Sequence, residues 1–326
     1  MKADDMRMTE EDVVCCALPM FHTFCINCNL LASAASGACL ILPPDRHSET
    51  TLTYIERYRC TMLTAVPSVY LTLIARPDLR PERVASLRCG IVGGAYCSPE
   101  QFRAIEGKLG MTLLPGLGQS EVIAGATIAS PEESLEVRST TLGHFVDRLE
   151  GRIVGHEVPM GEGDTQAGEI QVRGPMVMLG YYENGKVVSA VDEDGWLHTG
   201  DLGWQDAEGN IHYAGRIKDI IIRGGENIMP SEIEAVLSGD VRISCCKAVG
   251  IPDDHYGEVP CICIVPGSGA ALSEAQVRSA MCHRLAAFKV PKFILFFSKF
   301  PYTNTGKINC KKVAAIARQT ILGSAQ

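Results

Sequence analysis

Four short stretches of this sequence place charged side chains beside glycine residues, where a loop could present them to a ligand. They are residues 116–121 (GLGQSE), 195–201 (GWLHTGD), 215–234 (GRIKDIIIRGGENIMPSEIE) and 301–308 (PYTNTGKI). Carboxylate oxygens suit a hard cation such as magnesium, and the planar fork of arginine suits ribose or phosphate oxygens. Three of these stretches also have a plain structural explanation. The helix dipole favours a glutamate near a helix start, aspartate often stabilises a turn, and a Gly-Lys pair is commonly a solvated loop.

The stretch 215–234 reads as a strand, a glycine turn and a helix. The β-branched run at 220–222 predicts the strand, and the two glycines after it predict the turn. Ser231 lies three residues before Glu234, which is the spacing of a capping box and predicts the start of the helix. The strand also carries four charged residues, Arg216, Lys218, Asp219 and Arg223. An ordinary buried strand does not hold that much charge, so we expect a junction between two bodies here.

In their order and spacing, the four stretches resemble the motifs of the adenylate-forming (AMP-binding) superfamily. This group includes acyl-CoA synthetases, 4-coumarate-CoA ligases, luciferases and the adenylation domains of peptide synthetases. The resemblance covers nearly the whole chain, and residues 19–22 (PMFH) and 288–291 (FKVP) favour acyl-CoA synthetase or carnitine-CoA-ligase-like members. It implies an ATP-dependent acid–thiol ligase that acts in fatty acid metabolism, with a small carboxylic acid, ATP and coenzyme A as partners.

The resemblance implies that the turn after the expected strand 111–114 binds adenine. It matches the family's Y-G-x-T-E motif with two departures, because Leu117 stands where an aromatic ring normally stacks and Ser120 replaces threonine. Serine keeps the hydroxyl group, whereas leucine loses the stacking and is expected to weaken or alter adenine binding. Asp201 is expected to accept both ribose hydroxyls. The implied nucleotide-binding residues are Gly94, Gly116, Leu117, Gly118, Gln119, Ser120, Asp201 and Arg216.

The same resemblance implies two catalytic residues. Glu121 would hold Mg²⁺ and Lys307 would offset the negative charge that meets an attacking carboxylate at the α-phosphate of ATP. Lys218 would be the pivot about which a small C-terminal lid turns between the two half-reactions. After that rotation Gly224 and Gly225 would face the site, where the absence of side chains admits the pantetheine arm of coenzyme A.

The turn at residues 19–22 is similar to a P-x-F-H segment that lies beside the acyl pocket in the family. The resemblance implies that Phe21 and His22 line the place where the substrate carboxylate sits. The alternative is that His22 starts a helix and is satisfied by the backbone.

One family element is not found in this sequence. Members carry, ahead of the region matched here, a Ser/Thr/Gly-rich loop that ends in Lys-Gly and wraps the β- and γ-phosphates. We therefore expect Met1 to lie partway through the large domain, with part of the sheet uncovered. The chain is then either a fragment of a longer gene product or complete and impaired.

These alternatives leave three functional hypotheses. The first is an AMP-forming carboxylic acid:CoA ligase. The second is a non-catalytic remnant that binds nucleotide or a partner. An adenylation domain serving a carrier protein is the least favoured, because no carrier domain follows Ser324. Hydrolase motifs of the G-x-S-x-G and H-E-x-x-H types are absent from the sequence, and so is G-x-x-x-x-G-K-[ST].

The pattern of elements predicts an α/β fold in three parts. Strands alternate with helices over residues 1–140, which predicts a mainly parallel sheet whose ligand lies beyond the carboxyl ends of the strands. Short strands and glycine turns over 141–217 predict a small antiparallel barrel. Residues 218–326 are expected to form the α+β lid, with one of its helices capped by Ser273 and Gln276.

Composition narrows the class of protein. The chain has 326 residues, 46% of them hydrophobic, and a formal net charge of -8, so it can bury a core and is not expected to bind nucleic acid. Its acidic, polar beginning is unlike a signal peptide, and its longest early apolar stretch is too short to span a bilayer. Fourteen cysteines fall in apolar segments. We interpret them, including the lone C-x-x-C of Cys25 and Cys28, as reduced core residues of a cytoplasmic protein.

Overall fold

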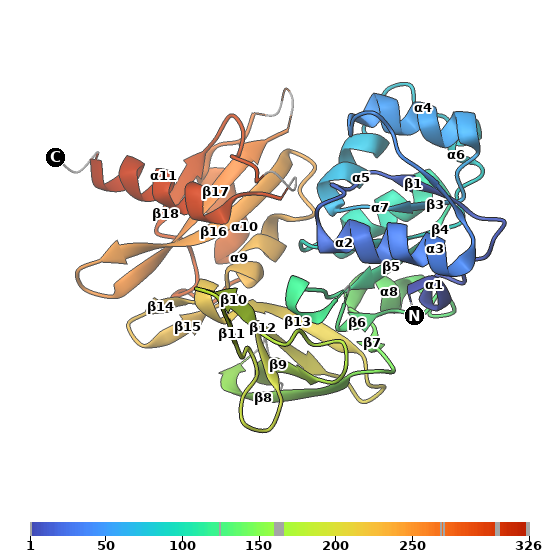
Figure 1. The fold of residues 1–326 in the computed structure, drawn as a ribbon. Coiled ribbons are helices and arrows are strands. Elements are labelled where there is room, and N and C mark those ends of the chain that lie inside the picture. The colour runs from blue at the N-terminus through green and yellow to red at the C-terminus, as the bar shows by residue number, and fades with distance from the viewer. Residues whose placement is uncertain are drawn as a thin grey trace.

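The computed structural model describes residues 2–123, 125–159, 166–267, 269, 271–303 and 307–323. Figure 1 shows three groups of elements: helices packed around a parallel sheet, an antiparallel sheet beside them, and a C-terminal group of strands and helices. This mixed α/β architecture agrees with the expected class.

The N-terminal group is built on a five-stranded parallel sheet in the order β2-β1-β3-β4-β5. Its strands are β1 (Val13–Cys16), β2 (Cys39–Ile41), β3 (Met62–Thr64), β4 (Cys89–Gly93) and β5 (Thr112–Gly116). Successive side chains of a strand point to opposite faces. Val14 accordingly packs with one core cluster and Cys15 with the other, and Met62 and Leu63 divide in the same way.

Helices cover both faces of this sheet. One face packs against the helices α4 (Ser48–Tyr58), α5 (Pro67–Ile74), α6 (Pro81–Val84) and α7 (Pro99–Leu109). The other face packs against α1 (Lys2–Asp5), the π-helical turn η1 (Ile26–Leu31) and α3 (Ala32–Ser36). A capping box begins α7, since Ser98 Oγ accepts from the Gln101 amide and the Gln101 side chain accepts from the Ser98 amide.

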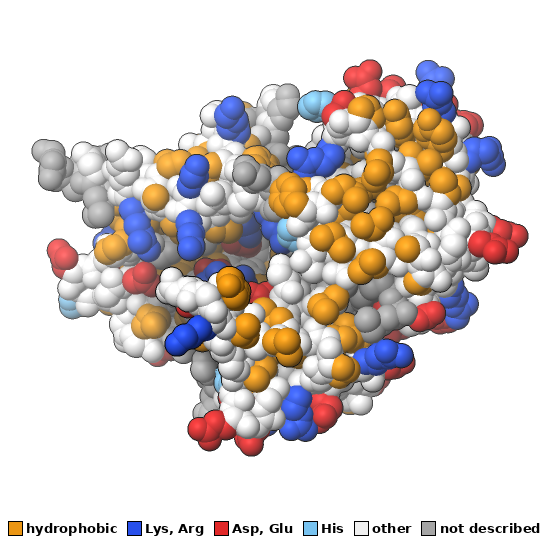
Figure 2. Space-filling view, in the orientation of Figure 1, with side chains coloured by type: hydrophobic (Ala, Val, Ile, Leu, Met, Phe, Trp, Pro, Cys, Tyr) orange, Lys and Arg blue, Asp and Glu red, His pale blue; other side chains and the backbone are white. Residues whose placement is uncertain are grey.

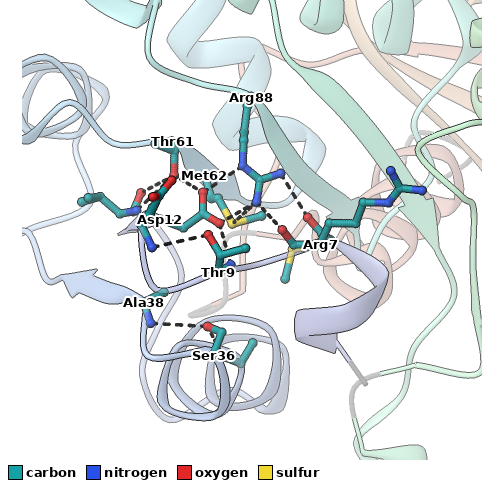
Figure 3. Close-up of polar contacts among 12 residues, drawn as sticks. Arg7, Thr9, Asp12, Ser36, Ala38, Thr61, Met62 and Arg88 are labelled. Atoms are coloured by element: carbon teal, nitrogen blue, oxygen red, sulfur yellow. Dashed lines mark hydrogen bonds and ion pairs between the residues drawn. The ribbon is translucent and has the colours of Figure 1, made fainter.

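A buried carboxylate ties the amino ends of these strands together, as Figure 3 shows. Asp12 is almost fully buried and accepts hydrogen bonds from Thr61 Oγ1 (2.6 Å), Arg88 Nε (2.8 Å) and the Thr9 amide (2.9 Å). Burial alone would raise the pKa of Asp12, but the bonds from Arg88, Thr61 and Thr9 outweigh it and lower that pKa to about 2. The carboxylate therefore stays charged and joins β1, β3 and β4.

The middle of the chain forms antiparallel structure. Strands β8 (Glu150–Pro159), β9 (Gln166–Arg173), β12 (Leu197–Gln205) and β13 (Ile211–Arg216) pair in the order β13-β12-β9-β8. Among the described residues no ladder joins β13 to β8, so these strands form an open sheet where the sequence predicts a small antiparallel barrel. The smaller elements nearby are β6 (Thr127–Ile128), β7 (His144–Phe145), α8 (Leu135–Thr140), and the hairpin β10 (Tyr181–Glu183) with β11 (Lys186–Val188).

The C-terminal group contains a five-stranded sheet with both antiparallel and parallel pairs. It consists of β14 (Ile221–Arg223), β15 (Glu226–Ile228), β16 (Ile243–Asp253), β17 (Gly257–Pro266) and β18 (Phe293–Phe296). Helices α9 (Pro230–Leu237) and α10 (Glu274–Cys282) cover one face, and α11 (Cys310–Gly323) covers the other. Ser273 and Gln276 form the expected capping box of α10.

Residues 215–234 connect the open antiparallel sheet to the C-terminal sheet and differ in part from the predicted strand, turn and helix. β13 ends at Arg216, a single 3₁₀ turn, η3 (Ile217–Asp219), follows, and only then does β14 begin. The predicted capping box of Ser231 and Glu234 is wrong. Met229 is the N-cap of α9, Ser231 Oγ donates to the Ala214 carbonyl, and Glu234 accepts from Lys247 Nζ (2.6 Å).

Two general expectations can be set beside the structure. The fourteen cysteines are all free, but Cys39, Cys282 and Cys310 are exposed, so the prediction that the cysteines are core residues is wrong for these three. Within the described ranges, no helix combines the length and the apolar character that crossing a membrane requires. The boundaries 1–140, 141–217 and 218–326 stay predictions.

Candidate active site

One cavity of about 810 Å³ lies where the three groups of elements meet. Its wall includes the carboxyl ends of β4 and β5, the facing ends of β12 and β13, and Lys307 from the C-terminal group. In Figure 2 the surface is hollowed between the C-terminal group and the group that holds the parallel sheet. Ligand sites of parallel sheets are expected at such strand ends.

Glycine turns let the backbone form this wall. Gly94 follows β4 with φ of +78°, a conformation that side-chain-bearing residues rarely adopt. Gly116 ends β5, and a Cβ there would lie 2.7 Å from the Thr127 carbonyl oxygen. The Leu117 amide donates to Thr127 Oγ1 (3.1 Å), so Leu117 is fixed at the cavity by its backbone.

The residues after Gly118 turn back towards the antiparallel sheet. Gln119 Nε2 donates to the Thr199 carbonyl (2.8 Å) and to Asp201 Oδ2. Ser120 and Glu121 lie in the 3₁₀ turn η2 (Ser120–Val122), and both line the cavity. Tyr181 Oη donates to Glu121 Oε1 (2.9 Å), which holds this carboxylate in a set direction.

Asp201 is the buried anion of the site, with only 3% of its surface exposed. It pairs in register with Arg216 across β12 and β13, and its Oδ1 lies 2.7 Å from Arg216 Nε. This contact is an ion pair without the alignment of a good hydrogen bond. Burial raises the pKa of Asp201, while the positive charge of Arg216 opposes the rise. An oriented carboxylate of this kind can accept two adjacent hydroxyl groups.

A second layer of polar residues fixes the turn that carries Asp201. The register of β12 against β9 shifts between His198 and Leu202, and Gly200 takes a φ of +69° there. Glu169 of β9 accepts from the Gly200 amide (3.0 Å) and lies 2.8 Å from His198 Nδ1. Such an irregularity re-aims side chains, and here Asp201 points into the cavity.

Lys307 reaches the cavity from the loop before α11. A Cβ built on Gly94 would lie 3.2 Å from Lys307 Nζ, so the ammonium group rests against the glycine turn after β4. Burial and repulsion from Arg216 lower the pKa of Lys307, and attraction by Asp201 opposes that effect. The Lys307 carbonyl accepts from the Thr303 amide (2.8 Å), and its own amide donates to Thr303 Oγ1 (3.2 Å). Residues 304–306 of the predicted loop lie outside the described residues.

Of the two residues predicted for the acyl pocket, only His22 lines the cavity. His22 lines the cavity and also caps α2 (Thr23–Cys25), since its Nδ1 accepts from the Phe24 amide (3.1 Å). His22 therefore lines the cavity and also starts a helix, so its position agrees with both alternatives given for it. Burial and the nearby charge of Lys307 lower its pKa. Phe21 is 71% exposed and does not line the cavity, whereas Phe24 does, so the structure does not support the pocket position expected for Phe21.

The residues predicted for lid movement lie at different distances from the cavity. Lys218, in η3, lines it. Gly224 and Gly225 form the tight turn of the β14–β15 hairpin, with φ of +60° and +92°, and do not line it. Their predicted contact with coenzyme A needs a different lid position and stays a prediction.

Most of the expected site residues therefore converge. Those lining the one cavity are His22, Gly94, Gly116, Leu117, Gly118, Gln119, Ser120, Glu121, Asp201, Arg216, Lys218 and Lys307. Sequence reasoning missed the supporting group of Tyr181, Glu169 and His198. Glu169 and Tyr181 lie outside the four stretches with charged residues beside glycine, and His198 lies within one of them without an expected role. No sequence signal points to them, because the contacts of Glu169 and His198 depend on the register of β9 against β12 and that of Tyr181 on the fold.

Family models match both ends of the chain. One described as "AMP-binding enzyme" matches residues 1–182, and one described as "AMP-binding enzyme C-terminal domain" matches residues 232–307. The chain is 33% identical over 307 residues to the mitochondrial medium-chain acyl-CoA ligase ACSF2 of Danio rerio, covering 92% of this chain and 50% of that protein. It is 33% identical over 319 residues to the indoleacetate–CoA ligase of Aromatoleum aromaticum, covering 97% of this chain and 61% of that protein.

This chain is also similar to a solved structure. ATP-bound MatB from Rhodopseudomonas palustris superimposes with a TM-score of 0.88 at 28% identity, over 98% of this chain and 62% of that one. The chain thus spans from half to about three fifths of the length of the relatives named here.

Proposed function

Because this chain belongs to the AMP-binding enzyme family, we propose that it acts as an AMP-forming carboxylic acid:CoA ligase. In the first step the acid attacks the α-phosphate of ATP, an acyl-adenylate forms and pyrophosphate leaves. In the second step the thiol of coenzyme A attacks the acyl carbon, a thioester forms and AMP leaves. The acyl-CoA ligases among the relatives support this reaction class.

The observation that carries the proposal is the convergence of opposite charges on one cavity. Asp201 with Arg216 lies on one wall, and Lys307 lies against Gly94 on another. Asp201 would accept hydrogen bonds from ribose hydroxyls, and Arg216 would reach ribose or phosphate oxygens. Lys307, partly removed from water, would stabilise the charge that develops at the α-phosphate.

Glu121 is the residue that we propose for Mg²⁺. Its carboxylate faces the cavity, Tyr181 holds one of its oxygens, and carboxylate oxygen is what this cation prefers. When bound, the ion would neutralise phosphate charge. Lys307 and Glu121 would then act on the same nucleotide from two sides.

For the second step we propose that the C-terminal group turns about Lys218. That residue lies in the single 3₁₀ turn between the open antiparallel sheet and the C-terminal sheet. The turn would bring Gly224 and Gly225 to the cavity, where they leave room for the pantetheine arm. A small carboxylic acid substrate, a cytoplasmic location and a role in fatty acid metabolism belong to the same proposal.

The alternative is a chain that binds nucleotide or a partner without catalysis. A non-catalytic chain that binds nucleotide or a partner protein would keep the Asp201 side of the cavity without turning over. An adenylation domain serving a carrier protein would differ only in the thiol acceptor.

Exchange of pyrophosphate into ATP, measured with a panel of medium-chain, arylacetic and cinnamic acids, separates these functions. We expect exchange with at least one acid, and a loss on the order of a hundredfold in Lys307→Ala, because one stabilising charge is removed. Lys311→Ala, an exposed lysine on α11, is the matched control. No exchange with any acid, together with retained nucleotide binding, would support the non-catalytic function.

A further inference from the structure

Three sulfur atoms face one another in the connection between β1 and α2. Cys16 ends β1, Cys25 ends α2, and Met20 lies in the turn between them. The Cys16 Sγ–Cys25 Sγ distance is 3.1 Å, Cys25 Sγ–Met20 Sδ is 3.5 Å, and Cys16 Sγ–Met20 Sδ is 3.9 Å. They form a closed triangle, which three sulfurs spaced along one apolar segment need not do. None of the three lines the nucleotide cavity.

The triangle is buried but not sealed. Cys16 and Cys25 are 4% and 0% exposed, whereas Met20 is 40% exposed and so connects the two thiols to the surface. A small ion can therefore reach the thiols past a single flexible side chain.

A buried amide also points at this cluster. Asn29 lies in η1, the π-helical turn that directly follows Cys25, and it is fully buried. Its Nδ2 lies 3.9 Å from Cys25 Sγ, and its Oδ1 has no hydrogen-bond partner among the described atoms. Buried amides are normally satisfied, and π-helical turns are frequent at functional sites. The side chain that contacts Cys25 therefore keeps an oxygen that can accept one further hydrogen bond.

We propose that Cys16, Met20 and Cys25 form a three-sulfur binding site for a soft monovalent cation, Cu(I). Thiolate and thioether ligands together select Cu(I), whereas zinc takes cysteine, histidine and carboxylate ligands. Binding forms two metal–thiolate bonds and one metal–thioether bond and releases the two thiol protons to water. No electron is transferred, so no oxidant or reductant takes part.

The three sulfur–sulfur distances are close to those that a bound Cu(I) ion requires. Metal–sulfur bonds of about 2.3 Å in a trigonal plane place the sulfurs about 4 Å apart. The two edges to Met20 already approach this value, and the Cys16–Cys25 edge would open by about 0.9 Å. That opening moves the thiols away from a disulfide, whose sulfurs are bonded at about 2.05 Å.

The site would also steady one wall of the nucleotide cavity. His22 and Phe24 line that cavity and lie in the segment enclosed by the three sulfurs. A bound ion would hold both ends of this segment, which links metal occupancy to the position of His22.

The test is a competition titration of the reduced, metal-free protein under anaerobic conditions, with Cu(I) supplied as its coloured bicinchoninate complex. The chelator suppresses weak binding by the other cysteines. We expect the wild-type protein to withdraw one equivalent, and both Cys16→Ala and Cys25→Ala to lose it. Met20→Leu keeps both thiols and is expected to weaken binding about tenfold or more. Met281→Leu and Cys89→Ala, which alter buried sulfurs elsewhere, should bind as the wild type does.

Each other outcome counts against the site. If Met20→Leu matches the wild type, the thioether is not a ligand and the three-sulfur site is wrong. Equal binding by all variants would mean that Cu(I) sits on other cysteines. X-ray absorption of the loaded protein should show three sulfur neighbours, and two would contradict the proposal. None of these readouts uses nucleotide or turnover, so they are independent of the ligase activity.

Discussion

Lys307 and Gly94 illustrate how closely the site residues depend on one another. Gly94 both takes a left-handed backbone conformation and leaves the space in which the lysine ammonium rests. The pKa of Lys307 is lowered by burial and by Arg216, so the group is held in a partly desolvated place where its charge acts strongly. A side chain at position 94 would disturb both properties at once.

We predict that Gly94→Ala lowers adenylate formation about tenfold or more, because the added methyl group displaces the lysine from its working position. Gly107→Ala is the matched control. A Cβ at Gly107, within α7, meets nothing within 4 Å, so that change should leave activity intact and raise stability by about 0.5–1 kcal/mol. Pyrophosphate exchange and thermal melting measure the two effects. Equal activity of both variants would show that Lys307 does not work from this position.

His198 offers a second prediction at this scale. Burial opposes its charged form, but Glu169 and Asp192 outweigh burial and raise the pKa of the ring. When the pKa of a group is higher in the folded state than in the unfolded state, its protonation stabilises the fold. This stabilisation is complete at a pH below the unfolded-state pKa and is lost as the pH rises through the folded-state pKa. NMR titration should therefore find the His198 pKa above 6.5, and Glu169→Gln should bring it down. An unchanged His198 titration in Glu169→Gln would mean that the carboxylate does not hold this ring.

Among the elements, the amino ends of β1, β3 and β4 depend on the Asp12 carboxylate. Its lowered pKa, about 2 against an ordinary 3.8, corresponds to about 2 kcal/mol of stability. This stability is present above the ordinary pKa and is lost as the pH falls towards 2.

We predict that Asp12→Asn destabilises the protein by about 2 kcal/mol or more at neutral pH, because Arg88 loses its charged partner. The difference from wild type should shrink as the pH falls from about 4 towards 2, as followed by denaturant unfolding. The exposed Asp147→Asn serves as control. A difference that does not change with pH would show that packing, and not the charge of Asp12, is what the substitution removes.

Elements of strong local pattern were predictable from the sequence. The strands β1 and β3–β5 and the capped starts of α7 and α10 follow from apolar runs and from serine and glutamine three residues apart. The Ser231–Glu234 spacing failed because tertiary partners compete with it. Lys247 and the Ala248 amide take the Glu234 carboxylate, and the Ala214 carbonyl takes the Ser231 hydroxyl.

Site residues were predictable where a motif names them, and less so where the fold supplies them. The converging set from Gly94 to Lys307 came from the family resemblance. Glu169 and the three-sulfur cluster depend on register and on a folded turn, which no spacing rule reveals. The expected cavity position of Phe21 is taken by Phe24, three residues further along the turn, and the sequence does not show which of the two rings faces the cavity.

The molecule as a whole divides at η3, where the open antiparallel sheet gives way to the C-terminal sheet. A single 3₁₀ turn can absorb the change in backbone angles that a lid rotation needs. We predict that Lys218→Pro, which fixes one of those angles, spares binding of an acyl-adenylate but slows its conversion to thioester.

Synthetic acyl-adenylate and coenzyme A, supplied together, measure that step without requiring adenylate formation. The expected loss is on the order of tenfold or more. Lys218→Ala, which keeps the backbone free, should retain more activity than Lys218→Pro. Equal rates in the two variants would contradict a hinge at Lys218.

The central claim is that one cavity holds an adenylate between Asp201 and Lys307. Calorimetry with a non-hydrolysable acyl-adenylate analogue tests it most directly, using the wild type, Asp201→Asn and an analogue without the ribose hydroxyls. The account predicts binding of one analogue per chain, and a loss of about tenfold or more both in Asp201→Asn and for the dideoxy analogue, because charged hydrogen bonds to ribose are lost. Unchanged affinity in both cases, or no binding to the wild type, would contradict it.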